Sequence, residues 1–235
     1  MTTIRGLTFD VGGTLAEGYL DKKAFVSKAL DYLSGLGHRV SVPRYKRALG
    51  RAMRELEALR SSGREMSFER FYSLVLSGLG IRADEELLAG LKDVYFSCFV
   101  ASPVPGVEEL LAELSGRYEL AVISNSMSSW PRVFLERERL ARYFKAIVIS
   151  GEVGWKKPHR RIFQVALTRM GLEASEAVHV GNSPEDDILG AKSVGMRAVL
   201  LWPSGGADAS WPVEPDATIR SLGELPRVLE ELDPP

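Results

Sequence analysis

The stretch that most constrains the fold runs from Ile4 to Leu15, where a short apolar run leads directly into an acid, two glycines and a threonine. Leu7 to Phe9 is typical of a buried strand, and Asp10 follows at its carboxyl end. Glycines directly after a strand permit a tight turn and let backbone N–H groups converge on an anion. Because open α/β sheets bind ligands at the carboxyl ends of their strands, Asp10 is a candidate nucleophile, metal ligand or both. Taken alone, the stretch is equally compatible with an ordinary strand-end turn.

Residues 22–100 show the spacing of four amphipathic helices and contain no convincing strand. Apolar side chains recur at i, i+3, i+4 and i+7, which is the pattern of a half-buried helix. A helical bundle inserted after the first strand is therefore expected over residues 17–102. The apolar faces run from Phe25 to Leu36, from Tyr45 to Leu56, from Phe68 to Leu79 and, after Asp84 as the expected N-cap, from Leu87 to Phe99.

The pattern changes at residues 102–106, after which strands and helices alternate. The strands are nearly continuous apolar runs, as expected for strands covered on both faces. Such alternation predicts right-handed crossovers and a doubly wound parallel sheet, that is, a Rossmann-like α/β core. The first strand must join this sheet, so the core is expected to comprise residues 1–16 and 103–235. The predicted strands are 119–124, 146–150, 177–181, 197–202 and 216–219, and the helices are 107–116, 130–141, 159–171, 185–195 and 222–232.

Composition limits the partners and the compartment. A formal net charge of −1 gives no reason to expect nucleic acid or a membrane surface as a partner. The single cysteine, Cys98, precludes an internal disulfide and is interpreted as buried packing. Without a signal-peptide pattern or an apolar run of about 18 residues, a soluble cytoplasmic protein is expected. The oligomeric state is left open.

Amide side chains are scarce. The chain holds two asparagines, Asn125 and Asn182, and one glutamine, Gln164, beside abundant Glu and Arg. Scarcity of these heat-labile residues points to a thermophilic source.

Polar residues gather at the predicted strand ends, and both asparagines are among them. In a parallel sheet these ends meet in one crevice, so the residues are expected to form one site. Each group of residues also has a simple structural explanation: a short turn at a strand end, a solvated basic patch at 156–161, or a helix cap at 186–187. Their order along one predicted edge of the sheet nevertheless favours a single site. The residues are Asp10, Thr14, Ser124, Asn125, Lys156, Lys157, Asn182, Ser183, Asp186 and Asp187.

These side chains suit a reaction in which a carboxylate attacks an anionic substrate and takes over one of its groups. Asp10 can attack a phosphoryl or carbon electrophile, and Lys157 can neutralise the charge of the transition state. Thr14 and Ser124 supply hydroxyls, and a helix beginning after Ser124 would offer free N–H groups to an anion. Asp186 and Asp187 could hold a hard cation, with the Gly12 carbonyl as a third ligand.

The order of these motifs resembles the haloacid dehalogenase superfamily over nearly the whole chain. The inserted bundle is similar to the first type of cap in that family, a lid over the site. The motifs are Asp10-x-x-x-Thr14, the apolar strand ending at Ser124, Lys157-Pro158 with Ile162-Phe163, Val180-Gly181-Asn182-Ser183 with Asp187, Gly190-Ala191 with Gly195-Met196, and the closing Leu222 to Pro226.

The resemblance implies a role for each of these residues. Asp10 would be the covalent nucleophile and Lys157 the electrostatic anchor. Thr14 and Ser124 would hold the substrate's phosphate or carboxylate, with Gly13, Asn125 and Asn182 as further substrate-binding residues. Mg²⁺ would be bound by Asp10, the carbonyl of Gly12 and the loop after Gly181, with Asp186 and Asp187 as its acids.

Two residues depart from the phosphatase pattern. Phosphatases of the family carry an acid at the position of Gly12, where general acid–base catalysis typically contributes about 10²–10⁴ in rate. Asn182 stands where the family usually has an acid, which would weaken Mg²⁺ binding. Dehalogenases lack the acid at the first of these positions and need no metal, but they usually have an aromatic residue there and a tyrosine in place of Phe163.

Three functions remain open at this point. A phosphatase of a small phosphorylated metabolite, acting through an aspartyl-phosphate at Asp10, is favoured. A metal-independent 2-haloacid dehalogenase and an anion-binding module without useful turnover are the alternatives. A phosphonoacetaldehyde hydrolase would need a lysine of the cap as a Schiff base, and Lys22, Lys23 and Lys46 are interpreted as solvated. His179 is interpreted as a packed or hydrogen-bonded core residue.

Overall fold

The computed structural model describes residues 3–204, 211 and 213–233. The chain divides into two compact units, Met1–Glu17 with Ser102–Pro235 and, separately, Gly18–Ala101. We call the first the core unit and the second the helical unit.

The core unit contains a six-stranded sheet in which every pair of neighbouring strands is parallel. The strand order is β5-β4-β1-β6-β7-β8, so β1 lies in the middle between β4 and β6. This topology confirms the predicted Rossmann-like α/β fold and places the end of β1 at the centre of the carboxyl edge. The strands are β1 (Gly6–Phe9), β4 (Glu119–Ser124), β5 (Ala146–Ile149), β6 (Ala177–Gly181), β7 (Arg197–Leu201) and β8 (Ala217–Ile219).

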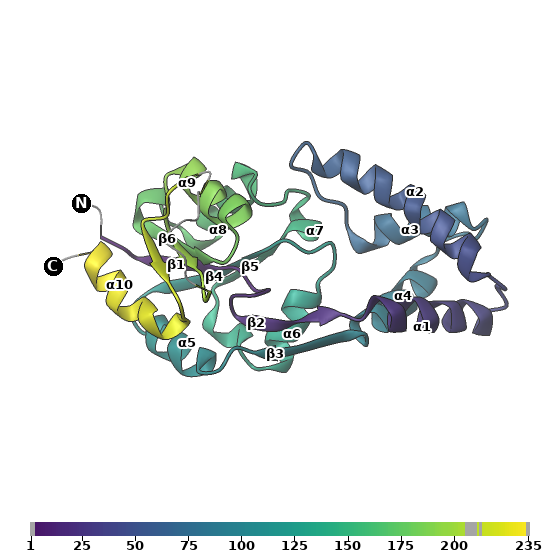
Figure 1. Cartoon of the computed structure of the whole chain (residues 1–235), viewed down its shortest axis with the longest axis horizontal. Helices are drawn as coiled ribbons and strands as arrows, with labels where there is room; N and C mark the ends of the chain where they lie inside the picture. Colours follow the sequence, from purple (N-terminus) through teal and green to yellow (C-terminus); the bar gives the residue numbers. More distant parts are fainter. Residues whose placement is uncertain (1–2, 205–210, 212, 234–235) are drawn as a thin grey trace. The chain divides into compact units, whose positions relative to one another are not determined.

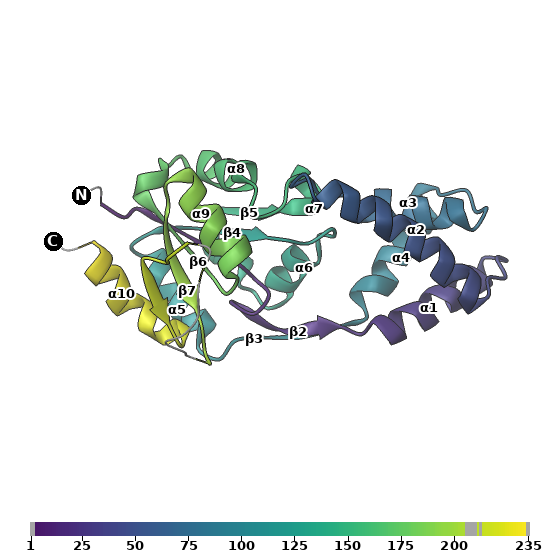
Figure 2. The same ribbon diagram turned by 45° about the horizontal axis from the view of Figure 1, so that its top comes forward.

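Helices cover both faces of this sheet (Figures 1 and 2). On one face lie α8 (Arg160–Met170) and α9 (Leu189–Val194), and on the other lie α5 (Val107–Ser115) and α10 (Leu225–Leu232). Alternate side chains of β4 and β5 pack with those of α8 and α9 in one buried cluster. Because both faces are buried, the strands need apolar side chains at successive positions, which is the continuous pattern seen in the sequence.

Three predicted helices of the core unit are interrupted, and the one expected over 222–232 begins as a 3₁₀ turn, Leu222–Glu224, before α10. The helix expected over 130–141 is α6 (Trp130–Arg137) followed by a 3₁₀ turn, because Arg139 takes a left-handed backbone with a φ of 59°. The helix expected over 185–195 begins as a π-helical turn, Pro184–Ile188, and becomes α-helical only at α9. A further short helix, α7 (Ser150–Val153), follows β5 directly.

The helical unit contains the four predicted helices. They are α1 (Lys22–Gly35), α2 (Val42–Arg60), α3 (Phe68–Gly78) and α4 (Glu85–Phe96). The side chain of Asp84 accepts a hydrogen bond from the N–H of Leu87 at 2.9 Å, as expected for the N-cap of α4. Aromatic rings of α1, α3 and α4 form the core of this unit, with Phe25 edge-on to Tyr72 and Tyr95.

The prediction of no strand over residues 22–100 was wrong at its last two residues, Phe99 and Val100, which open β3 (Phe99–Pro103). β3 pairs with β2 (Ala16–Leu20), a strand that was not predicted, and α4 ends before Phe99 rather than including it. Phe99 continues the helical spacing of Tyr95, whereas its strand conformation depends on pairing with a segment about 80 residues away in the chain. Such non-local pairing leaves no local periodic signal. Cys98 is buried and unpaired, as predicted.

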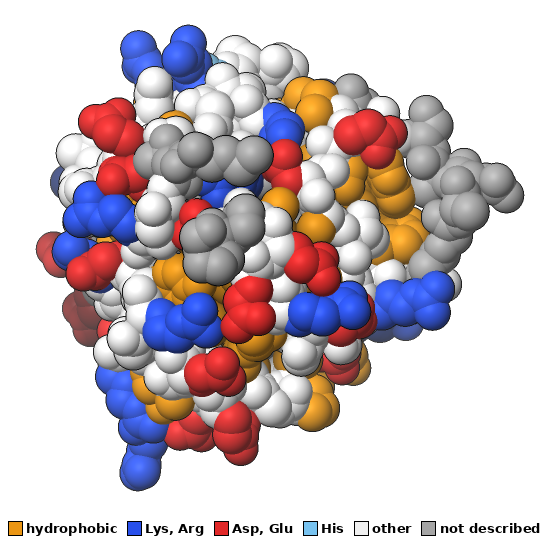
Figure 3. Space-filling view, turned by 90° about the vertical axis from the view of Figure 1, so that its left-hand side faces the viewer, with side chains coloured by type: hydrophobic (Ala, Val, Ile, Leu, Met, Phe, Trp, Pro, Cys, Tyr) orange, Lys and Arg blue, Asp and Glu red, His pale blue; other side chains and the backbone are white. Residues whose placement is uncertain are grey.

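Acidic and basic side chains are interspersed over the described part of the face shown in Figure 3. Within the described chain, no helix is both long enough and apolar enough to cross a membrane.

Candidate active site

Three buried charges meet at the carboxyl edge of the sheet. Lys157 Nζ lies 2.7 Å from Asp10 Oδ1 and 2.6 Å from Asp187 Oδ1. Asp10 follows β1, Asp187 lies in the π-helical turn after β6, and Lys157 comes from the loop before α8. Their relative exposures are 8% for Asp10 and 1% for each of the others, so one ammonium balances two carboxylates almost out of contact with solvent.

Burial and the shared lysine separate the protonation behaviour of the two acids. Burial, together with the nearby Asp187 carboxylate, raises the pKa of Asp10 to about 6 despite the ammonium of Lys157. Burial also acts to raise the pKa of Asp187, but Lys157 and His179 outweigh it and hold that pKa well below its usual range. Burial would lower the pKa of Lys157, yet its two carboxylate neighbours raise it. Above about pH 6, Asp10 therefore presents an ionised oxygen beside a permanent cation.

The residues after Asp10 form a compact turn in which one backbone carbonyl accepts several N–H groups. The Val11 carbonyl accepts the N–H groups of Leu15 and Ala16 at 3.0 and 2.8 Å. Gly13 has a φ of 79°, and a Cβ there would overlap the amide of Asn182, so the two predicted substrate-binding residues lie against each other.

The hydroxyl of Thr14 is fully buried and has no hydrogen-bond partner among residues 3–204, 211 and 213–233. A buried polar atom without a partner is costly in a folded protein. Its position four residues after Asp10 is therefore consistent with an anion that would supply the missing hydrogen bond.

Asn125 fixes the backbone of the lysine loop. Its Oδ1 accepts the N–H of Lys157 at 2.8 Å, and its Nδ2 donates to the Lys157 carbonyl at 3.1 Å. The same Nδ2 lies 3.1 Å from Asp186 Oδ2, and Lys156 Nζ lies 3.4 Å from Asp186 Oδ1. Asn125 therefore holds the backbone of Lys157 in place and joins it to the half-buried Asp186. Within the described residues, no hydrogen bond joins Asp186 to the Lys157 ammonium.

The helix expected after Ser124 begins where its predicted range, 130–141, places it. Ser124 ends β4 and is buried, and α6 begins at Trp130, but the N–H groups between them are not all free for an anion. The N–H of Ser126 donates to Ser150 Oγ, that of Ser128 donates to Ser126 Oγ, and that of Trp130 donates to Ser128 Oγ. Serine hydroxyls therefore take N–H groups that the prediction had assigned to an anion.

Two of the four predicted metal ligands, Asp186 and Asp187, have both carboxylate oxygens engaged by other residues and do not fit a metal site made by the protein alone. Asp187 Oδ1 is contacted by Lys157 and by His179, and its Oδ2 accepts the N–H of Ser183 at 3.0 Å. Both oxygens of Asp186 are likewise engaged, with Asn125 and Lys156. Mg²⁺ requires near-octahedral oxygen ligands. In the described part of the chain no three His, Cys, Asp or Glu side chains are grouped so that they could hold a metal ion.

The sequence did not reveal the polar contacts of β6. His179 is fully buried, with Nε2 at 3.1 Å from Asp187 Oδ1 and Nδ1 at 2.8 Å from Thr8 Oγ1. The interpretation of His179 as a hydrogen-bonded core residue is confirmed. Its partners could not be predicted, because they require the pairing of β1 with β6 and the π-helical turn.

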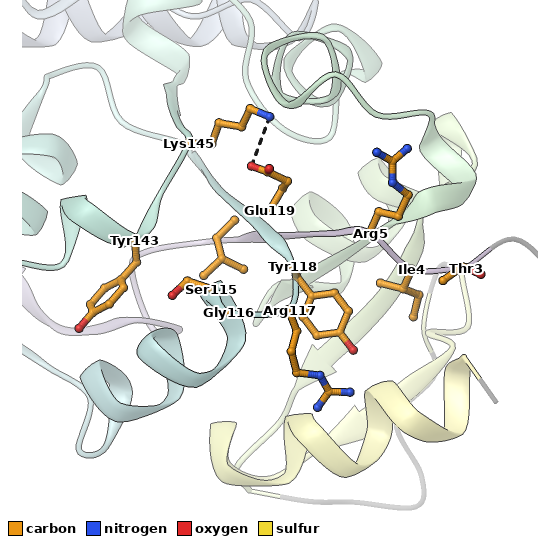
Figure 4. A pocket seen from close by; sticks show the side chains of 11 residues that line it. Thr3, Ile4, Arg5, Ser115, Gly116, Arg117, Tyr118, Glu119, Tyr143 and Lys145 are labelled. Carbon is orange, nitrogen blue, oxygen red and sulfur yellow. Dashed lines mark ion pairs between the residues drawn. The ribbon is translucent and has the colours of Figure 1, made fainter. Parts of the chain in front are cut away.

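A cavity of about 580 Å³ lies at the amino ends of β1 and β4, at the edge opposite Asp10 (Figure 4). Arg5 pairs with Glu176 at 2.8 Å, and Lys145 pairs with Glu119 at 3.3 Å. Its charges are thus mostly balanced within the protein, and the cavity is not part of the candidate site.

Comparison with known proteins identifies the family. The profile of the haloacid dehalogenase-like hydrolases matches residues 4–195. A ribulose-1,5-bisphosphate 5-phosphatase of Halopiger xanaduensis is 37% identical over 145 residues, covering 57% of this chain and 61% of that protein. A glyceraldehyde 3-phosphate phosphatase of Methanocaldococcus jannaschii is 31% identical over 169 residues, covering 70% of this chain and 73% of that protein.

A solved structure matches over almost the full length. A 2-haloacid dehalogenase from Pseudomonas syringae pv. Tomato shares 30% identity with a TM-score of 0.73, covering 98% of this chain and 100% of that one. The alignment to the Halopiger phosphatase, by contrast, spans about three fifths of that relative's length. Since the family profile covers most of the chain and its motifs meet at one sheet edge, the chain belongs to the haloacid dehalogenase-like hydrolases.

Proposed function

We propose that the protein is a phosphatase that forms an aspartyl-phosphate at Asp10. The observation that carries the proposal is the buried ion pair between Asp10 Oδ1 and Lys157 Nζ, at 2.7 Å, at the carboxyl end of the central strand. Several relatives in the comparison are phosphatases of small metabolites, which supports this substrate class.

The chemistry follows from these groups in two displacements. An ionised oxygen of Asp10 forms a bond to phosphorus while the ester bond breaks, and the electron pair leaves with the ester oxygen. A water then attacks phosphorus, which frees the Asp10 carboxylate and releases inorganic phosphate. Lys157 stabilises the charge that accumulates between nucleophile and phosphoryl group, and its own burial beside Asp10 strengthens that electrostatic effect.

Thr14, Ser124, Gly13, Asn125 and Asn182 are proposed to bind the phosphoryl oxygens or to place the groups that do. Phosphatases of this family generally use Mg²⁺. Here the resident cation at the nucleophile is Lys157, and no step above is assigned to a metal. The helical unit is proposed to be the cap that selects the substrate.

Gly12 leaves the ester oxygen without a protein acid, so the leaving group must take its proton from water. Aryl and acyl phosphates, which need least protonation, are expected to react faster than alkyl phosphates. A Cβ at Gly12 would meet no atom of the described residues within 4 Å, so they leave room for an acidic side chain there.

The Gly12→Asp variant is expected to raise kcat on an alkyl phosphate such as glycerol phosphate by about 10²-fold or more, while the rate on p-nitrophenyl phosphate changes little. Gly12→Asn, of the same shape but without an acid, is the matched control. An equal gain in both variants, or a gain in neither, would contradict the role assigned to position 12.

A second candidate is dehalogenation of a 2-haloacid. It is favoured by the likeness to the Pseudomonas dehalogenase over the full chain and by Gly12, because halide departs without a proton. Asp10 would then attack the carbon that bears the halogen, and water would hydrolyse the resulting ester. Phe163, where those enzymes have tyrosine, speaks against it.

One experiment separates the candidates. Wild type and Asp10→Asn are assayed with p-nitrophenyl phosphate and with 2-chloropropionate, each with Mg²⁺ and with a chelator. The phosphatase proposal expects phosphate release that disappears in Asp10→Asn, whereas halide release that withstands the chelator would establish the dehalogenase. Thermal stabilisation by orthophosphate without either product would indicate an anion-binding module.

A further inference from the structure

We propose that His179 is a positioning residue for the reaction at Asp10, which it serves by holding Asp187 so that Lys157 stays on the nucleophile. The inference rests on the proposed attack by Asp10 and adds a residue that the assigned chemistry does not use. It is carried by a continuous buried chain of contacts from Thr8 through His179, Asp187 and Lys157 to Asp10.

Both neighbours of Asp187 use the same oxygen. Lys157 Nζ lies 2.6 Å and His179 Nε2 lies 3.1 Å from Asp187 Oδ1, and all three side chains are at most 2% exposed. A carboxylate oxygen has two lone pairs and accepts two hydrogen bonds. Together with the N–H of Ser183 on Oδ2, these donors fix the carboxylate on both oxygens.

Contacts of both ring nitrogens fix the orientation of the His179 ring. Asp187 is already held as an acceptor, so Nε2 must carry the proton in that contact, whether the ring is neutral or charged. Nδ1 faces Thr8 Oγ1 at 2.8 Å, and Thr8 and His179 are direct partners in the register of β1 with β6. Phe163 of α8 packs edge-on against the ring at 5.2 Å.

His179 affects Asp10 because Asp10 and Asp187 compete for the ammonium of Lys157. Lys157 contacts the two carboxylates at nearly equal distances, 2.7 and 2.6 Å. The hydrogen bond from His179 takes up part of the charge of Asp187 and thereby weakens its pull on Lys157. Without that bond Lys157 would shift toward Asp187, and the transition state at Asp10 would lose part of its countercharge.

Three substitutions of His179 test this argument. In Gln the amide nitrogen reaches about as far as Nε2 and can still donate to Asp187, whereas in Asn it reaches only as far as Nδ1, and Leu has no donor. We expect kcat to fall about 10–100-fold in His179→Asn and His179→Leu, the range typical when a partner that orients a functional group is removed. In His179→Gln kcat should stay within about fivefold of wild type, with KM changing little in all three.

Melting temperature is measured in parallel, and activity is assayed well below the lowest of them. If all three variants lost activity in step with stability, or if Asn and Leu kept the wild-type kcat, His179 would be a packing residue only and the proposal would be overturned.

A readout without turnover keeps this test separate from the proposed function. In ¹⁵N-labelled protein, the ring of His179 should show a proton on Nε2 whose resonance moves in Asp187→Asn but not in Lys192→Met, a variant at a partly exposed ion pair with Asp216 that is not part of this chain of contacts. A ring protonated only on Nδ1 would overturn the proposal. If wild type turned over neither substrate while Nε2 carried the proton, the proposed function would fail but the contact to Asp187 would stand.

Discussion

Replacing Lys157 by methionine is expected to destabilise the folded protein by about 3–5 kcal/mol and to abolish turnover. Methionine matches the length of the lysine stem but leaves Asp10 and Asp187 buried beside each other without a countercharge. Removing one partner of a buried ion pair costs more than the pair itself contributes, because a desolvated charge remains. Urea denaturation at pH 8, with phosphatase assays on the same samples, measures both effects.

Lys156→Met is the matched control. Lys156 is the neighbouring residue, but its side chain is 21% exposed and its contact with Asp186 is 3.4 Å long. Its loss should cost no more than about 1 kcal/mol, as for other solvent-exposed pairs. If the two methionine variants were equally stable, the buried pair would not have the role assigned to it. Adding Asp187→Asn to Lys157→Met should recover part of the lost stability.

The Asp10→Asn substitution is expected to stop turnover while making the fold more stable at pH 8. The pKa of Asp10 is raised from its ordinary value near 3.8 to about 6, mainly by burial. The folded state therefore holds the proton more tightly than the unfolded state, so the ionised carboxylate destabilises the fold above pH 6. A shift of roughly two pH units corresponds to about 3 kcal/mol, which asparagine would relieve. The loss of kcat should be at least about 10⁴-fold, as for other covalent nucleophiles.

The pH dependence of stability tests whether the ionised Asp10 carboxylate destabilises the fold. Below about pH 4 Asp10 is protonated in both states, and asparagine gives no advantage. The stability difference between variant and wild type should grow between about pH 4 and pH 6 and then stay constant. Glu185→Gln removes an exposed carboxylate nearby and should shift stability by no more than about 0.5 kcal/mol at any pH. A less stable Asp10→Asn at pH 8 would show that Lys157 needs Asp10 more than burial penalises it.

Much of the fold could be predicted from local pattern. β4 and β6 begin and end where the apolar runs of the sequence do. α5 ends one residue before its predicted end, and α8 is one residue shorter than predicted at each end. These segments are buried on the faces that their own periodicity indicates, so local composition and tertiary packing agree. Local pattern did not indicate β2 and β3, because their pairing depends on contacts between segments far apart in the chain.

Asp186 and Asp187 show the limit of sequence reasoning at the site. Adjacent and identical, they were both assigned to a metal. In the structure Asp187 is buried against Lys157 and His179, while Asp186 is half-buried beside Asn125 and Lys156. The π-helical turn directs the two side chains to different partners, and nothing in their order along the chain encodes that difference.

The sequence by itself determined which residue types reach the carboxyl edge of the sheet. Apolar periodicity fixes the strands, and the parallel topology brings their ends together whatever the side chains there are. Only the tertiary structure decided which of those side chains touch. Contacts such as Lys157 to Asp10 and His179 to Asp187 depend on strand register, burial and the geometry of one turn, and these are set when the whole sheet packs.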